Sequence, residues 1–279
     1  MHTTIVSAQE VHAHIDDPLW VVVDCRHALL DFSAGRKQYE TSHIPGAFFA
    51  DVERDLAGAH TGKNGRHPLP EWSIFEKWLR SLGIDDDTQV VAYDAGADMF
   101  AARLWYMLRL TGHDAVAVLD GGFAAWTQAG YPVDSAVPKK PDDGTITLQP
   151  RSDMMLDANG VLRALEARTI TLLDARGADR FQGENETIDP VAGHIPGAVN
   201  RPFRSNFNEQ GRFKRPDELR KEFEAMELNT GEIVHQCGSG VSAAVNMLAM
   251  EIAGLPKTKL YPGSWSEWCS DSSRPMVTY

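Results

Sequence analysis

The chain carries the same ordered motifs twice, and this duplication limits the folds it can adopt. An apolar run closed by Asp-x-Arg stands at residues 19–26 and again at 170–176. The pentapeptide His-Ile-Pro-Gly-Ala follows the aspartate by 19 residues in the first copy and by 20 in the second. Two later segments match in the same order: 91–96 with 233–238, and 121–126 with 263–268. Four ordered matches predict two domains of one fold.

Each copy alternates short β-rich runs with longer helical patterns, which is typical of βαβ units and a parallel sheet. The expected strands are 19–24, 89–93, 116–119, 169–173, 232–236 and 259–261. The expected helices are 72–82, 99–110, 157–167, 216–226 and 242–253. The predicted fold class is therefore α/β, with two tandem domains, each a mainly parallel sheet flanked by helices.

Composition predicts where the two domains meet. Residues 135–152 carry three prolines, two adjacent lysines and Asp-Asp-Gly, which is typical of a linker. The expected domains are 1–134 and 153–279, with 135–152 between them. Residues 145–148 are a candidate strand that opens the second domain.

Charge and cysteine usage exclude several function classes. The net charge of −12 argues against nucleic acid or an anionic membrane as a partner. The three cysteines include no C-x-x-C pair and are interpreted as free thiols in a reducing compartment. The chain has no signal-peptide pattern and no run of 18 apolar residues. We therefore expect a cytoplasmic protein. We also expect no metal site, since His12 and His14 have no further ligand nearby.

The stretch most suited to chemistry runs from residue 233 to 250. A β-leaning run ends at Gln236, Cys237 follows, and a short Gly-rich loop leads into an Ala-rich helical pattern. Backbone N–H groups at a helix N-terminus favour an anion, so a cysteine placed there is expected to ionise easily. The residues of the candidate loop are Gly238, Ser239, Gly240, Val241, Ser242 and Ala243.

Features present in both copies are interpreted as structural, and features present in one copy as functional. The Asp-x-Arg residues occur in both copies and are expected to fix loops at strand ends; they are Asp24, Arg26, Asp174 and Arg176. Two features are unmatched. In this alignment of the two copies, Cys237 corresponds to Ala95. Arg180 stands six residues after Asp174 and corresponds to Leu30, which stands six residues after Asp24. The second copy is therefore expected to carry the site.

The remaining candidates have structural interpretations. Cys25 and Cys269 are expected to fill packed positions. His43 and His194 stand at equivalent places and are interpreted as loop anchors. His43 is also kept as a residue that could face the cleft.

Two other interpretations of the loop are weaker. Gly238-x-Gly240-x-x-Ala243 fits a loose dinucleotide fingerprint, but no acidic residue ends a strand about 20 residues on. A cysteine phosphatase needs Cys-x5-Arg to bind phosphate, and Ala243 occupies the arginine position. A short loop with amides as its fixed donors suits one added atom on the sulfur.

Taken together, these motifs resemble the tandem-domain rhodanese sulfurtransferases over essentially the whole chain. The loop Cys-Gly-Ser-Gly-Val-Ser-Ala at 237–243 is similar to the 3-mercaptopyruvate sulfurtransferase version. Thiosulfate-preferring members have basic residues directly after the cysteine. The resemblance implies that Cys237 is the nucleophile that becomes a persulfide, that Arg180 binds the donor's anionic group, and that no cofactor is needed. Ser239 resembles a loop serine proposed to assist proton transfer.

One departure from the family pattern leaves the donor open. The mercaptopyruvate enzymes carry a second carboxylate-binding arginine nine residues after the first, where this chain has Asp189. The expected activity is ping-pong transfer of sulfane sulfur from a small anionic donor, 3-mercaptopyruvate, to cyanide, a thiol or a thioredoxin-type protein. The alternatives are a thiosulfate sulfurtransferase, a persulfide carrier with little turnover, and a redox or regulatory binding protein.

Overall fold

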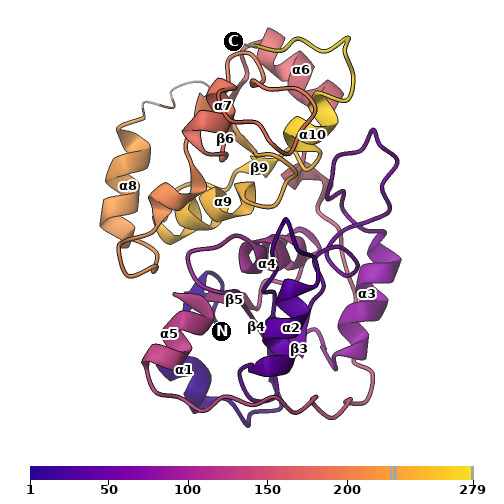
Figure 1. Cartoon of the computed structure of the whole chain (residues 1–279), viewed down its shortest axis with the longest axis vertical. Coiled ribbons are helices and arrows are strands. Elements are labelled where there is room, and N and C mark those ends of the chain that lie inside the picture. The colour runs from indigo at the N-terminus through magenta and orange to yellow at the C-terminus, as the bar shows by residue number, and fades with distance from the viewer. Residues whose placement is uncertain (227, 229–230, 278–279) are drawn as a thin grey trace. The chain divides into compact units, whose positions relative to one another are not determined.

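The chain folds into two compact units in a computed structural model that describes residues 1–226, 228 and 231–277 (Figure 1). Unit 1 comprises Met1–Gly58, Pro70–Arg151 and Phe207–Phe213. Unit 2 comprises Ala59–Leu69, Ser152–Asn206 and Lys214–Tyr279. The chain thus passes from unit 1 to unit 2 near residue 151, but two short segments belong to the unit of the other repeat.

Residues 135–151 do not stand apart as a linker, because they belong to unit 1. The expected strand at 145–148 is absent. The backbone N–H of Thr145 donates to Asp85 at 2.7 Å, and that of Ile146 donates to the Ile84 carbonyl at 3.1 Å. The prediction that this segment opens the second domain is therefore wrong.

Unit 1 is built on a five-stranded sheet in which every neighbouring pair is parallel. The strands, in sheet order, are β1 (Ile5–Val6), β5 (Val116–Leu119), β4 (Gln89–Tyr93), β2 (Trp20–Asp24) and β3 (Phe48–Phe49). The helices are α1 (Ala8–Ala13), α2 (Ala34–Thr41), α3 (Trp72–Ser81), α4 (Phe100–Leu110) and α5 (Gly122–Gln128). All eleven residues of α4 are buried, so this helix is enclosed on every side.

Unit 2 repeats the plan with a four-stranded parallel sheet. The strands, in sheet order, are β7 (Val199–Asn200), β6 (Ile170–Asp174), β8 (Glu232–Gln236) and β9 (Lys259–Leu260). The α-helices are α6 (Ala158–Glu166), α7 (Ala178–Gln182), α8 (Pro216–Glu224), α9 (Ala243–Ile252) and α10 (Ser264–Trp268). Two 3₁₀ helices, η1 (Ser152–Met154) and η2 (Phe203–Asn206), complete it. The two tandem α/β domains expected from the sequence are confirmed.

The duplicated Asp-x-Arg motif fixes the loop that carries His-Ile-Pro-Gly-Ala. In unit 1 the Arg26 guanidinium binds both oxygens of Asp24 and donates at 2.6 Å to the backbone carbonyl just before His43. In unit 2 Arg176 binds Asp174 and donates at 2.9 Å to the carbonyl just before the second pentapeptide. All four side chains are buried, and their predicted structural role is confirmed.

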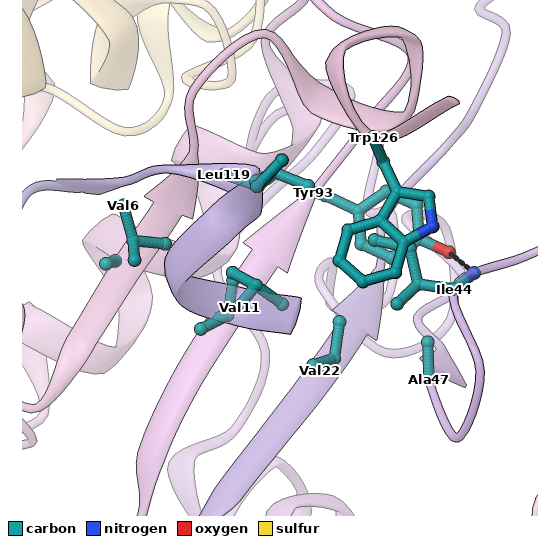
Figure 2. Close-up of a cluster of buried hydrophobic side chains, with 11 residues drawn as sticks. Val6, Val11, Val22, Ile44, Ala47, Tyr93, Leu119 and Trp126 are labelled. Carbon is teal, nitrogen blue, oxygen red and sulfur yellow. Dashed lines mark hydrogen bonds between the residues drawn. The ribbon is translucent and has the colours of Figure 1, made fainter. Parts of the chain in front are cut away.

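The pentapeptide loop is also tied to the core of unit 1. Figure 2 shows Tyr93 and Trp126 among the buried side chains, with the Tyr93 hydroxyl beside the backbone of Ile44. That hydroxyl accepts from the Ile44 N–H at 3.2 Å and donates to Asp24 at 2.7 Å. The Tyr93 hydroxyl therefore links the backbone of the pentapeptide loop to the aspartate of the Asp-x-Arg motif. Among the residues that the structure describes, no helix has the length and apolar character needed to cross a membrane.

Candidate functional site

The cysteine loop lies at the carboxyl end of β8, one of the two inner strands of the unit 2 sheet. Strand β8 ends at Gln236, Cys237 follows, and α9 begins at Ala243. The Gly240 N–H donates to the Cys237 sulfur at 3.1 Å. Residues 243–250 of α9 are all buried, so the helix and its N-terminus are fixed in place. The turn thus presents a backbone donor and the N-terminal end of a helix dipole to the sulfur.

The first residues of α10 form hydrogen bonds with the backbone of the cysteine loop. The Cys237 carbonyl accepts from the Trp265 N–H at 3.0 Å, and the Cys237 N–H donates to the Ser264 hydroxyl at 3.1 Å. Gly240 has a φ of +76°, and a Cβ there would lie 2.2 Å from the Pro262 carbonyl oxygen. Only glycine fits this turn, which aims the Gly240 amide at the sulfur.

The structure shifts the predicted alignment of the two copies by one residue. Asp24 pairs with Tyr93 in the unit 1 sheet, whereas Asp174 pairs with Gln236 in unit 2. The counterpart of Cys237 is therefore Asp94. The expectation that Cys237 faces Ala95 is wrong, because matching the apolar runs by composition does not fix the register of a strand.

The predicted counterpart of Arg180 is also wrong. Phe181 stacks on His194 with ring centroids 3.9 Å apart, just as Tyr39 stacks on His43 at 4.1 Å. The residue before Tyr39 is Gln38, so Gln38 and not Leu30 matches Arg180. In unit 2 the segment between α7 and the pentapeptide is longer than its counterpart after α2, and the segment between the Asp-x-Arg motif and the helix is shorter. The two differences nearly cancel, so the distance along the chain from the aspartate to the pentapeptide is similar in both copies.

The longer segment brings acidic side chains to Arg180. Its guanidinium donates to Glu186 at 2.9 Å and to Asp189 at 3.0 Å. Burial alone would raise the pKa of Glu186, but hydrogen bonds from the Asp189 N–H and from Arg180 lower it below its ordinary value. Burial raises the pKa of Asp189, the Arg66 guanidinium opposes this, and Glu186 adds to it.

Besides Glu186, two residues at the site were missed by the sequence reasoning. Both belong to the segment Ala59–Leu69, which lies in unit 2 although it precedes the second repeat. Arg66 forms an ion pair with Asp189, and the His67 Nδ1 lies 2.7 Å from the Ser239 hydroxyl. His67 and Ser239 are 172 positions apart in the chain, so no spacing pattern could link them.

The other cysteines are poorly suited to attack a substrate. Burial and then Asp24 raise the pKa of Cys25 well above its ordinary value. Burial and then Asp189 raise the pKa of Cys269 to about 11. Both thiols are therefore protonated at neutral pH, as expected for packed residues.

His43 is fully buried in unit 1. Its ring nitrogens lie 2.7 Å from the Tyr39 carbonyl oxygen and 3.2 Å from that of Ala136. These contacts correspond to the loop-anchoring role expected for it. Within the described part of the chain, no group of three or more His, Cys, Asp or Glu side chains is arranged to hold a metal ion.

The fold and the loop define a duplicated α/β protein with one cysteine at a strand-to-helix turn and arginines beside it. The chain belongs to the rhodanese-like domain family, whose model matches residues 7–129 and 157–271. The resemblance inferred from the motifs is thereby confirmed.

The names of similar proteins include both 3-mercaptopyruvate and thiosulfate sulfurtransferases. A protein of Pseudomonas aeruginosa named probable 3-mercaptopyruvate sulfurtransferase is 44% identical over 279 residues, covering 98% of each chain. The thiosulfate sulfurtransferase of Bos taurus is 38% identical, over 84% of this chain and 79% of its own. The structure of 3-mercaptopyruvate sulfurtransferase from Leishmania major matches 98% of this chain and 76% of its own, with a TM-score of 0.86 and 30% identity.

Proposed function

We propose that the chain is a sulfurtransferase that moves sulfane sulfur from 3-mercaptopyruvate to a thiol or cyanide through a persulfide on Cys237. The observation that carries this proposal is the Gly240 N–H at 3.1 Å from the Cys237 sulfur, at the N-terminus of a buried helix. The loop offers backbone amides to one further sulfur atom that bears negative charge. The loop residues 238–243 and Arg180 keep the roles expected of them, as parts of this proposal.

In the first half-reaction the Cys237 thiolate attacks the donor sulfur. The sulfur–carbon bond breaks, and the electron pair remains on the donor's methylene carbon as the enolate of pyruvate. The donor's S–H proton passes to that carbon, which releases pyruvate and leaves a deprotonated persulfide. In this proposal the Ser239 hydroxyl and the His67 ring, which lie 2.7 Å apart, relay this proton.

In the second half-reaction an acceptor removes the outer sulfur and regenerates the thiolate. Cyanide, a small thiol or a thioredoxin-type dithiol has the required nucleophile. No step needs a metal or organic cofactor. We place the protein in the cytoplasm, a reducing compartment, since Cys25, Cys237 and Cys269 are all free.

A thiosulfate sulfurtransferase is the second candidate, because a relative covering 84% of this chain carries that name. The two donors differ chemically. Thiosulfate leaves as sulfite and needs no proton on a carbon atom, whereas 3-mercaptopyruvate needs one. The Ser239–His67 pair therefore favours 3-mercaptopyruvate.

Mass spectrometry of the intact protein tests the proposal. Incubation with 3-mercaptopyruvate should add about 32 Da, one sulfur atom, at Cys237. Cyanide should then remove the added mass, and Cys237→Ser should show neither step while keeping its circular dichroism spectrum. A stable adduct that no acceptor discharges would identify a carrier instead. Absence of an adduct with either donor would overturn the proposal.

A further inference from the structure

Two arginines at the site share one buried carboxylate. Arg66 Nη1 donates to one oxygen of Asp189, and Arg180 Nη2 donates to the other at 3.0 Å. The Asp189 side chain is only 2% exposed. A carboxylate held in this way fixes both guanidinium groups at once.

Each arginine also has a terminal nitrogen that is free to bind a ligand. Arg66 Nη2 and Arg180 Nη1 donate to no acceptor among residues 1–226, 228 and 231–277. Both nitrogens face Gly238. A Cβ added there would lie 2.9 Å from the first nitrogen and 3.5 Å from the second. Both guanidinium groups therefore lie beside the residue that directly follows Cys237, where a larger side chain at position 238 would displace them.

The charges around these two nitrogens are balanced. Arg66 and Arg180 supply two positive charges, while Asp189 and Glu186 supply two negative ones. The two arginines therefore offer directed N–H donors without an excess of positive charge. Such a site suits a planar carboxylate with a single charge, and it suits a dianion such as thiosulfate less well.

We propose that Asp189 is the positioning residue that makes this site selective for a monocarboxylate donor, with Arg66 and Arg180 as the two groups that bind the carboxylate. This inference rests on the proposed sulfurtransferase activity and deepens it by naming Arg66 as the second carboxylate-binding residue and Asp189 as the residue that sets the donor preference. Arg66 supplies the second cation, and it comes from the segment Ala59–Leu69. Asp189 tunes the pair instead of contacting the donor itself.

The test measures kcat and KM for 3-mercaptopyruvate and for thiosulfate, with cyanide as acceptor. Asp189→Asn removes one negative charge and should raise the thiosulfate to mercaptopyruvate ratio of kcat/KM by about tenfold or more. Arg66→Gln should raise the KM for 3-mercaptopyruvate by about tenfold or more, with a smaller effect on kcat, and Arg66→Lys should recover part of it.

A binding measurement tests the role of Arg66 without requiring catalytic turnover. Titration calorimetry with pyruvate on Cys237→Ser should show binding, which Arg66→Gln added to that variant should weaken by about tenfold or more. The matched control is Arg215→Gln, which removes the same charge from a side chain that is 77% exposed. This measurement decides the matter if Asp189→Asn does not fold.

Failure of the inference differs from failure of the proposed function. If the wild-type protein acquires no sulfur from either donor, the proposed sulfurtransferase activity is overturned. An active wild type whose donor ratio is unchanged in Asp189→Asn overturns only the selectivity. Equal pyruvate binding with Arg66→Gln and Arg215→Gln would likewise overturn the role of Arg66.

Discussion

Asp94 occupies in unit 1 the position that Cys237 occupies in unit 2. Each residue directly follows the strand that pairs with the Asp-x-Arg strand, and each stands six residues before a buried helix. The Asp94 carboxylate accepts from the Gly96 N–H at 3.0 Å and from the Ala101 N–H at 3.1 Å. In unit 1 the same loop thus binds its own side-chain anion and has no nucleophile.

This relationship predicts that Asp94 stabilises unit 1 without contributing to sulfur transfer. Asp94→Ala removes the acceptor of the buried Ala101 N–H and of the partly buried Gly96 N–H, which should cost about 1–3 kcal/mol of unfolding free energy. Urea unfolding measures the loss, and kcat with 3-mercaptopyruvate should be unchanged. A variant of wild-type stability would show that water replaces the carboxylate without cost.

Gly240→Ala should damage the loop for two reasons. A positive φ costs a non-glycine residue about 1–3 kcal/mol, and the added Cβ would lie 2.2 Å from the Pro262 carbonyl oxygen. Movement of the Gly240 amide away from the sulfur should lower kcat by about tenfold or more. Gly46→Ala is the matched control, because Gly46 has a similar φ of +75° and nothing within 4 Å of the added Cβ. Both variants should lose stability, and only Gly240→Ala should lose activity.

Ser239→Ala should separate the two donors. If the Ser239–His67 pair relays a proton to the pyruvate carbon, its loss should lower kcat with 3-mercaptopyruvate by about 100-fold. Turnover of thiosulfate should change much less, because sulfite leaves without protonation of carbon. His67→Gln should reproduce the same donor-dependent pattern. Equal losses with both donors would instead indicate a structural role for the pair.

His235 should make the protein less stable in acid. Burial, with a smaller effect from Arg201, lowers the pKa of His235 to about 3, and neither ring nitrogen has a partner in the described structure. The unfolded chain takes up this proton near pH 6.5, so the stabilisation is complete above that pH and is lost as the pH falls toward 3. The loss from pH 7 to pH 5 should be about 2 kcal/mol.

His235→Leu is the variant that tests this assignment, by urea unfolding at both pH values. It should reduce the pH dependence of unfolding by that amount. His60→Gln, at an exposed position, should leave it as in the wild type. An unchanged acid dependence in His235→Leu would place the acid sensitivity at other groups.

The regular elements were predictable because their residues are strongly patterned. Strands β4, β5 and β8 begin and end at the predicted residues, and the five predicted helices are present within two residues at each end. The short helices α1, α2, α5, α7 and α10 and the two-residue strands β1, β3 and β7 were missed. A short helix is not stable alone, so its sequence carries little periodicity and its existence depends on what it packs against.

The sequence by itself determined the duplicated α/β fold, the structural role of Asp-x-Arg and the cysteine at the strand-to-helix turn. These follow from local pattern and from repetition, which are visible along the chain. Only the tertiary structure decided that Asp94 is the counterpart of Cys237, and that Arg66 and His67 belong to unit 2. Strand register, compensating changes in loop length and contacts across more than a hundred residues depend on packing in three dimensions, and spacing along the chain does not encode them.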